Sequence, residues 1–171
     1  GIVDASRITS ITGTAAEINT AYSSSGISGL GNELAILTDT TLSANSLNIL
    51  DSYTTGIVKA ESITTLTGSV AEIIKAYNSS GITGLGDEAI ILSDSHTLNN
   101  LKIINNATTG IITLSDYTIS LYGSASDLAA ALDGNFASPY TGQIIIENSD
   151  YTIDQYNLIS DATTGTVTVS G

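Results

Sequence analysis

Four aspartates recur at one place in the repeating part of this sequence, and they could bind a cation. They begin the segments Asp39-Thr40-Thr41-Leu42, Asp94-Ser95-His96-Thr97-Leu98, Asp116-Tyr117-Thr118-Ile119 and Asp150-Tyr151-Thr152-Ile153. Ca²⁺ takes several oxygen ligands, and stacked Asp and Thr side chains would supply carboxylate and hydroxyl oxygens. We favour the alternative that each Asp ends a strand and accepts hydrogen bonds from the backbone of the following turn or helix. The glycine-rich nonapeptide of secreted Ca²⁺-binding β-rolls is missing.

Two glycine-rich loops have a composition that phosphate-binding loops share. They are Gly29-Leu30-Gly31 and Gly84-Leu85-Gly86, and no Lys-Ser/Thr pair follows either of them. Both loops lead into a predicted strand, and the neighbouring Glu33, Asp87 and Glu88 would repel a phosphate group. We therefore predict turn glycines that end a helix, with no phosphate site.

His96 is the single histidine, and the chain has no cysteine. Neither a Cys–His pair nor a multi-histidine metal site can therefore form within one chain. Carboxylates are numerous enough for glycosidase chemistry, but a regular array of repeats offers no evident pocket for a substrate. We predict that the chain is not an enzyme and has no catalytic, cofactor-binding or metal-binding residues.

Charge and composition exclude several kinds of partner. The 171 residues include 17 acidic and four basic side chains, which give a net charge of −13. Such a surface repels nucleic-acid phosphates and anionic lipid head groups, so we predict neither nucleic-acid binding nor membrane insertion. A hydrophobic content of 42% and a mean hydropathy of +0.24 predict a folded chain. Because only 12% of the residues are charged, the polar surface is mostly hydroxyl and amide, as on extracellular adhesins and shells.

The sequence is built from repeats. Thr12–Asp39 and Thr67–Asp94 are closely similar, and the equivalent glycines Gly1, Gly56, Gly110 and Gly165 are 55, 54 and 55 residues apart. We predict one segment, 1–171, with repeats 1–55, 56–109 and 110–164 and the start of a fourth at 165–171. Because the chain lacks Met and has the same repeat phase at both ends, we expect a piece of a longer array without a signal peptide or transmembrane run.

Each repeat contains two strand–helix halves. The predicted strands are rich in Ile, Val and Thr and comprise Ile2–Ala5, Leu34–Thr38, Ile57–Ala60, Ala89–Ser93, Ile111–Ser115, Gln143–Glu147 and Thr166–Val169. The predicted helices have apolar residues three and four apart and comprise Ala15–Tyr22, Ala44–Asp51, Val70–Tyr77, Asn99–Asn105, Ser126–Leu132 and Asp154–Ser160. Strands joined by helical crossovers lie parallel, so we predict an α/β solenoid with one long parallel β-sheet. A pure β-solenoid is the alternative.

Alternation along the predicted strands assigns their two faces. The residues facing the helices are Val3, Leu37, Val58, Leu92, Leu114 and Ile146. The opposite face carries Ile2, Ile36, Ile57, Ile91, Ile111 and Ile145, which we predict to form one apolar column covered by a further layer. The first and last strands have unprotected edges, so we also predict end-to-end stacking.

The repeat resembles a known group of proteins. The segments that carry the resemblance are TGTAAEINTAYSSSGISGLGNE and TGSVAEIIKAYNSSGITGLGDE, each followed by a strand, an Asp and a helix ending in Thr-Thr-Gly. They resemble repeats in very large secreted or cell-surface proteins of marine cyanobacteria and in virion proteins of their phages. The resemblance covers Ile8 to Asp51 and Ile63 to Asn105 well, and Ile111 to Thr164 in outline. It implies an extracellular structural or adhesive role with no catalytic residue.

Two functions are therefore compatible with the sequence. The first is a structural or adhesive segment of a coat, filament or fibre at the cell surface, which associates with itself end to end and through the outer sheet face. The alternative is an extracellular module that binds Ca²⁺ or a glycan along one edge of the stack.

Overall fold

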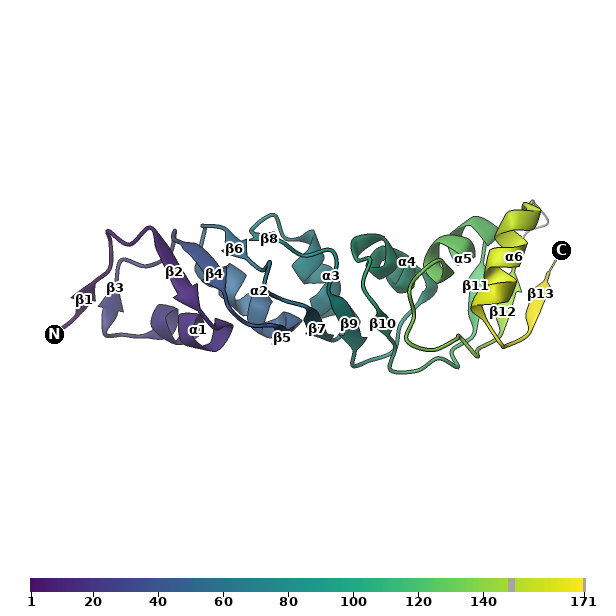
Figure 1. Ribbon diagram of the computed structural model, residues 1–171, viewed down its shortest axis with the longest axis horizontal. Helices are drawn as coiled ribbons and strands as arrows, with labels where there is room; N and C mark the ends of the chain where they lie inside the picture. The colour runs from purple at the N-terminus through teal and green to yellow at the C-terminus, as the bar shows by residue number, and fades with distance from the viewer. Residues whose placement is uncertain (148–149, 171) are drawn as a thin grey trace. The chain divides into compact units, whose positions relative to one another are not determined.

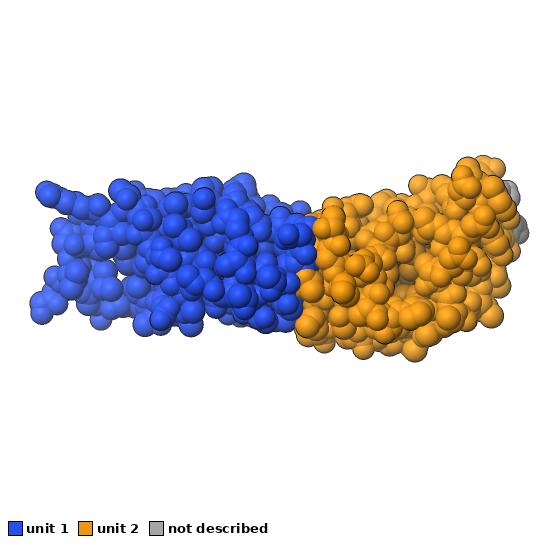
Figure 2. All heavy atoms as spheres, in the orientation of Figure 1, with its two compact units in different colours: residues 1–88 blue, residues 89–171 orange. Residues whose placement is uncertain are grey.

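The computed structural model describes residues 1–147 and 150–170, and it divides the chain into two compact units. Residues 1–88 form the first unit and residues 89–171 the second (Figure 2). Both units combine short parallel strands with helices, which confirms the predicted α/β class.

The first unit contains three helices and eight strands in its 88 residues. The helices are α1 (Ala15–Ser23), α2 (Ala44–Tyr53) and α3 (Val70–Asn78), and they follow one another side by side (Figure 1). The strands are β1 (Val3–Asp4), β2 (Ser10–Gly13), β3 (Ile27–Ser28), β4 (Leu34–Leu37), β5 (Thr41–Ser43), β6 (Val58–Lys59), β7 (Thr65–Gly68) and β8 (Ile82–Thr83).

In its described residues, the second unit contains three helices and five strands. The helices are α4 (Leu98–Ala107), α5 (Ala125–Leu132) and α6 (Ile153–Ala162). The strands are β9 (Ala89–Leu92), β10 (Ile112–Thr113), β11 (Leu121–Gly123), β12 (Ile144–Ile146) and β13 (Val167–Val169). The predicted six helices are thus confirmed, with small shifts at their ends.

A hydroxyl side chain fixes the start of every described helix. The N-cap residues are Thr14, Ser43, Ser69, Thr97, Ser124 and Thr152, and each hydroxyl accepts a hydrogen bond from a backbone N–H in the first helical turn. In α1 and α3, the carboxylates of Glu17 and Glu72 bond back to the N-cap backbone, which completes a capping box. Helices this short gain little from propensity alone, so the caps and the packing of one face define them.

The strands form several small parallel sheets. In the first unit, β1 pairs with β3, β5 pairs with β7, and β2, β4, β6 and β8 follow in that order. In the second unit, β9 pairs with β10, and β12 lies between β11 and β13. The sequence separation between paired residues is nearly constant: 24 positions for Ser10 and Leu34, 23 for Leu121 and Ile144, and 22 for Ile90 and Ile112.

The prediction of one long parallel β-sheet was therefore wrong. In the first unit, each strand–helix half carries two or three separate strands, and the sequence prediction recognised only the one rich in Ile and Val. It missed strands such as Thr41–Ser43 and Thr65–Gly68, which are dominated by Thr, Ser and Gly. These two strands nevertheless pair with each other, because they are about one half-repeat apart in the sequence.

The core of each unit lies between the strands and the helices. Of the residues predicted to face the helices, Leu37, Val58, Leu92, Leu114 and Ile146 are buried, as predicted. The helix residues that are at most 1% exposed include Ile18, Leu47, Leu50, Ile73, Leu101, Ile104 and Leu128. Val3 was predicted to be part of this core but is 62% exposed, because the two-residue strand β1 pairs only with β3.

Candidate functional site

Two of the four recurring aspartates bind backbone groups. Asp39 Oδ2 accepts a hydrogen bond of 2.7 Å from the N–H of Ala15, the first residue of α1. Asp116 Oδ1 accepts from both the hydroxyl and the N–H of Thr118, at 2.7 and 2.8 Å. These two bonds lower the pKa of Asp116, and the nearby His96 adds a smaller effect in the same direction. Asp116 thus has the structural role that we favoured from the sequence, whereas Asp39 also binds backbone but at the start of a helix 24 residues before it.

The other two aspartates do not complete a metal centre with them. Asp94 and Asp150 both have exposed side chains, and the Asp94 carbonyl accepts a hydrogen bond from the Ser115 hydroxyl. Within residues 1–147 and 150–170, the structure brings together no group of three or more His, Cys, Asp or Glu side chains that could hold a metal ion. The described geometry therefore offers no observation in favour of a Ca²⁺ ladder.

The two glycine-rich loops are turns that lead into the strands β4 and β9, but they follow the strands β3 and β8, so the prediction that they end a helix was wrong. Gly29 and Gly84 have φ angles of 85° and 86°, a region that side chains other than glycine rarely adopt. A Cβ atom on Gly29 would also lie 2.7 Å from the backbone nitrogen of Ser6. Glycine is thus required here by backbone conformation and by the close approach of a neighbouring turn.

The acidic residues after these loops are buried, which the sequence analysis missed. Glu33 and Glu88 are each 1% exposed. The Glu33 carboxylate accepts from the N–H of Gly31 and from the hydroxyl of Tyr22, at about 2.9 Å. The Glu88 carboxylate accepts equivalent bonds from Gly86 N–H and the Tyr77 hydroxyl. The signal in the sequence was a Tyr eleven residues before a Glu in both repeats.

The Glu33 carboxylate is held in its charged form. Burial raises the pKa of Glu33, but the hydrogen bonds from the loop N–H groups and from Tyr22 outweigh burial and leave the pKa below its usual value. Burial likewise raises the pKa of the Tyr22 hydroxyl, which stays protonated and donates. In the third repeat, Leu132 and Gly142 occupy the corresponding positions, so both partners of this pair are replaced together.

A buried histidine–tyrosine pair lies in the second unit instead. His96 is 4% exposed and Tyr140 is 1% exposed. The Tyr140 hydroxyl donates to the carbonyl of Ile119 at 2.7 Å, so its oxygen accepts the Nε2–H of His96 at 2.9 Å. Burial lowers the pKa of His96, and the charge of Asp116 partly opposes this. His96 is therefore neutral and acts as a packing residue, in the position that buried Leu42 has in the first repeat.

A shallow pocket of about 370 Å³ lies beside this pair, between residues 96–99 and residues 119–122. Its walls are mostly apolar, and Tyr122 at its edge is 65% exposed. No carboxylate lines it, so the pocket lacks the acid–base pair that glycosidase chemistry needs.

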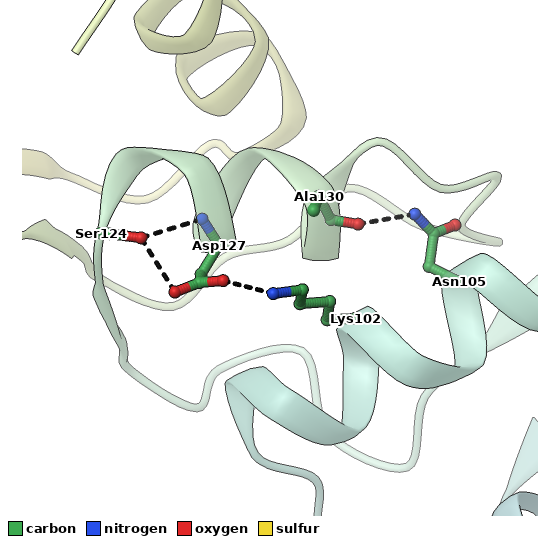
Figure 3. Close-up of polar contacts among 5 residues, drawn as sticks. All are labelled: Lys102, Asn105, Ser124, Asp127 and Ala130. Carbon is green, nitrogen blue, oxygen red and sulfur yellow. Dashed lines mark hydrogen bonds and ion pairs between the residues drawn. The ribbon is translucent and has the colours of Figure 1, made fainter.

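Neighbouring helices are joined by polar side chains (Figure 3). Lys102 of α4 forms an ion pair with Asp127 of α5, and Asp127 also accepts a hydrogen bond from the Ser124 hydroxyl. The hydrogen bond from Lys102 is the main cause that lowers the pKa of Asp127. Asn105 Nδ2 donates to the Ala130 carbonyl at 2.9 Å. In the first unit, Asn19 Nδ2 donates in the same way to the Ser46 carbonyl, and Asn48 Nδ2 to that of Glu72.

Four of the six isoleucines of the predicted apolar column are exposed, but the six do not form one column. Ile57, Ile91 and Ile111 are 38%, 44% and 48% exposed, and Ile2 is 70% exposed, while Ile36 and Ile145 are half-buried. Strand pairing places Ile36 opposite Lys59 and Ile91 opposite Thr113, so the isoleucines are not aligned one strand apart. The parity prediction was thus correct for these residues, but in these two strand pairs the isoleucines lie two residues away from the predicted alignment.

No protein family, curated protein or solved structure matches this chain. None of the helices formed by residues 1–147 and 150–170 combines the length and the apolar content needed to cross a bilayer.

Proposed function

We propose that this chain is a non-enzymatic structural or adhesive repeat segment of an extracellular coat, filament or fibre. The supporting observation is that strand pairing in either unit joins residues 22 to 24 positions apart, so each segment packs on the next segment of the same chain. Such nearest-neighbour packing is typical of solenoid arrays, whose length is set by the number of repeats. In this proposal, the chain is an α/β solenoid.

The extracellular location rests on two features of the sequence. The first is the resemblance to repeats of giant secreted and cell-surface proteins of marine cyanobacteria. The second is a polar surface of hydroxyl and amide groups with a net charge of −13, which is unfavourable for binding nucleic acid.

The partner in this proposal is the protein itself. Ile91 of β9 and Ile111, the residue just before β10, are large apolar side chains that are about half exposed, and a covering layer would remove them from water. Electron microscopy of the concentrated chain tests the proposal directly. Filaments or sheets support it, whereas particles that remain single chains at every concentration oppose it.

A double substitution tests the sheet face. We expect Ile91→Thr with Ile111→Thr to leave the chain folded, because both side chains point away from the core, while light scattering shows weaker association. The matched control is Ile90→Thr, which places a hydroxyl at a fully buried position and should destabilise the fold. Unchanged association of the double variant would show that this face is not the interface.

A ligand-binding module is the competing function, and melting experiments distinguish it. We expect that adding millimolar Ca²⁺ after EDTA treatment leaves the melting temperature unchanged, since the described residues form no metal-binding cluster. Neutral sugars, which would enter the pocket beside Tyr122, are expected to have no effect either. A saturable rise in melting temperature with Ca²⁺ or a sugar would favour the module.

A further inference from the structure

The strand β11 has an open edge well inside the chain. Its residue Leu121 donates its backbone N–H to the Gln143 carbonyl at 2.9 Å, so Leu121 faces β12. Alternate residues of a strand direct their N–H and C=O groups to opposite sides, so those of Ser120 and Tyr122 face away from β12. Within residues 1–147 and 150–170, neither Ser120 nor Tyr122 has a backbone hydrogen bond on that side.

The first unit shows which segment covers such an edge. β7 and β11 correspond, because each ends directly before an N-cap serine. β5 pairs in parallel with β7, and the N–H of Thr65 donates to the Thr40 carbonyl at 3.0 Å. Residues 95–97 correspond to β5, because both segments end on the N-cap of the following helix. Unlike β5, residues 95–97 form no strand and do not pair with β11.

The pocket of about 370 Å³ lies where this pairing is missing. Its walls are residues 96–99 and 119–122, which belong to the two segments that would otherwise pair. The buried Tyr140 holds these walls apart, because its hydroxyl bonds to His96 Nε2 on one wall and to the Ile119 carbonyl on the other. The gap beside β11 is therefore maintained by the core of the second unit.

We propose that this gap binds an extended peptide of a partner protein, which pairs in parallel with β11 as β5 pairs with β7. The backbone groups of Ser120 and Tyr122 supply the hydrogen bonds, and the apolar walls accept one aliphatic side chain. β5 provides the pattern of such a peptide, since Thr41-Leu42-Ser43 has one buried aliphatic residue between two small polar ones.

Charge narrows the choice of peptide further. The pocket walls contain no carboxylate and no Lys or Arg, and the chain as a whole has a net charge of −13. An acidic peptide would therefore be repelled, so the partner segment carries uncharged or basic residues. This partner surface goes beyond the proposed self-assembly and does not depend on it.

Proline substitutions test whether the edge is open. Pro lacks a backbone N–H, so it is tolerated where that group is unpaired and is destabilising where the group is part of a strand ladder. Thr67 of β7 corresponds to Tyr122 and faces β5. We expect Tyr122→Pro to leave the midpoint of urea unfolding nearly unchanged and Thr67→Pro to lower it clearly. Equal losses overturn the inference, because residues 95–97 would then cover β11.

A synthetic peptide tests binding. Its sequence is Thr-Thr-Leu-Ser-Ala-Asn, copied from residues 40–45, with both ends blocked to remove their charges. His96 is the single histidine, so its imidazole NMR signal reports on the pocket without ambiguity. We expect a saturable shift of that signal and slower hydrogen exchange of the Tyr122 amide. Replacing the Leu of the peptide by Asn should weaken binding by about tenfold or more, because the aliphatic side chain is lost.

Two variants at Tyr122 distinguish backbone pairing from contact with the exposed ring. Tyr122→Pro should abolish peptide binding, whereas Tyr122→Ala keeps the N–H and should bind within about threefold of the unsubstituted protein. Absence of a saturable shift, or equal binding to Tyr122→Pro, overturns the inference. Light-scattering association that Tyr122→Pro abolishes would also overturn it, since a second copy would then occupy the edge. None of these outcomes removes the proposed structural function, which electron microscopy tests separately.

Discussion

Replacing Gly56 by Ala is expected to lower the free energy of unfolding by about 3 kcal/mol or more. A Cβ atom at Gly56 would lie 2.2 Å from the carbonyl oxygen of Glu33 and 2.7 Å from its carbonyl carbon. These are backbone atoms, so no side-chain rotation relieves the clash, and two adjacent segments must move apart. Urea unfolding followed by circular dichroism measures the loss.

The matched control for this prediction is Gly26→Ala. The nearest heavy atom to a Cβ at Gly26 is the Ser24 hydroxyl oxygen, at 3.5 Å, which is an ordinary contact. We expect the free energy of unfolding of that variant to lie within about 0.5 kcal/mol of the value for the unsubstituted protein. Equal losses in the two variants would show that the close approach at Gly56 does not determine stability.

The same approach recurs in the second unit, where a Cβ on Gly165 would lie 2.2 Å from the Gly142 carbonyl oxygen. In both places, a buried Thr two residues earlier accepts the glycine N–H at 2.9 Å. The Thr-Thr-Gly motif is thus a junction at which the chain passes from a helix to the next strand in close contact with the preceding segment. Its repetition follows from packing, and it needs no ligand.

Replacing Glu33 by Ala should also destabilise the fold strongly, by about 3 kcal/mol. The substitution leaves the Gly31 N–H and the Tyr22 hydroxyl without their acceptor in a site where water has little access. Glu33→Gln keeps an acceptor oxygen and should lose less. Glu61→Gln removes a carboxylate with an exposed side chain and serves as a control, with an expected change within about 0.5 kcal/mol.

The Glu33 contribution should depend on pH in a defined direction. Because the pKa of Glu33 is lower in the folded chain than its usual value of 4.5, the folded state favours the charged form. Its stabilisation is therefore fully present above pH 4.5 and is lost as the pH falls further, through the folded pKa. Urea unfolding at a series of pH values from 6 down to 3 measures this loss. The free energy of unfolding should fall more steeply with decreasing pH for the unsubstituted protein than for Glu33→Gln. Parallel curves would contradict this assignment.

The helices were predictable because each has two independent local signals. Hydroxyl N-caps such as Thr14 and Ser69 mark where a helix starts, and apolar residues at helical spacing mark the face that is buried. The strand faces were equally clear from alternation in segments such as Leu34–Leu37. In both cases the information lies within a few neighbouring residues.

The missed features depend on residues that are distant in the sequence. The strand Thr65–Gly68 is defined by its pairing with Thr41–Ser43, since a short run of Thr and Gly has no strong strand signal of its own. The contact between His96 and Tyr140 joins residues 44 positions apart, in parts of the chain that depart from the repeat. The burial of Glu33 depends on a turn that brings the Gly31 N–H and the Tyr22 hydroxyl to its carboxylate.

The near-constant spacing of paired strands also has a consequence for how the chain folds. Since paired residues in either unit are at most 24 positions apart, only short loops must close, and the entropy lost per closure is small. Contacts of such low sequence separation favour rapid folding. Nucleation can begin at any internal helix pair and spread in both directions, as in a one-dimensional array. Folding can therefore start on the ribosome before the rest of the chain has been synthesised.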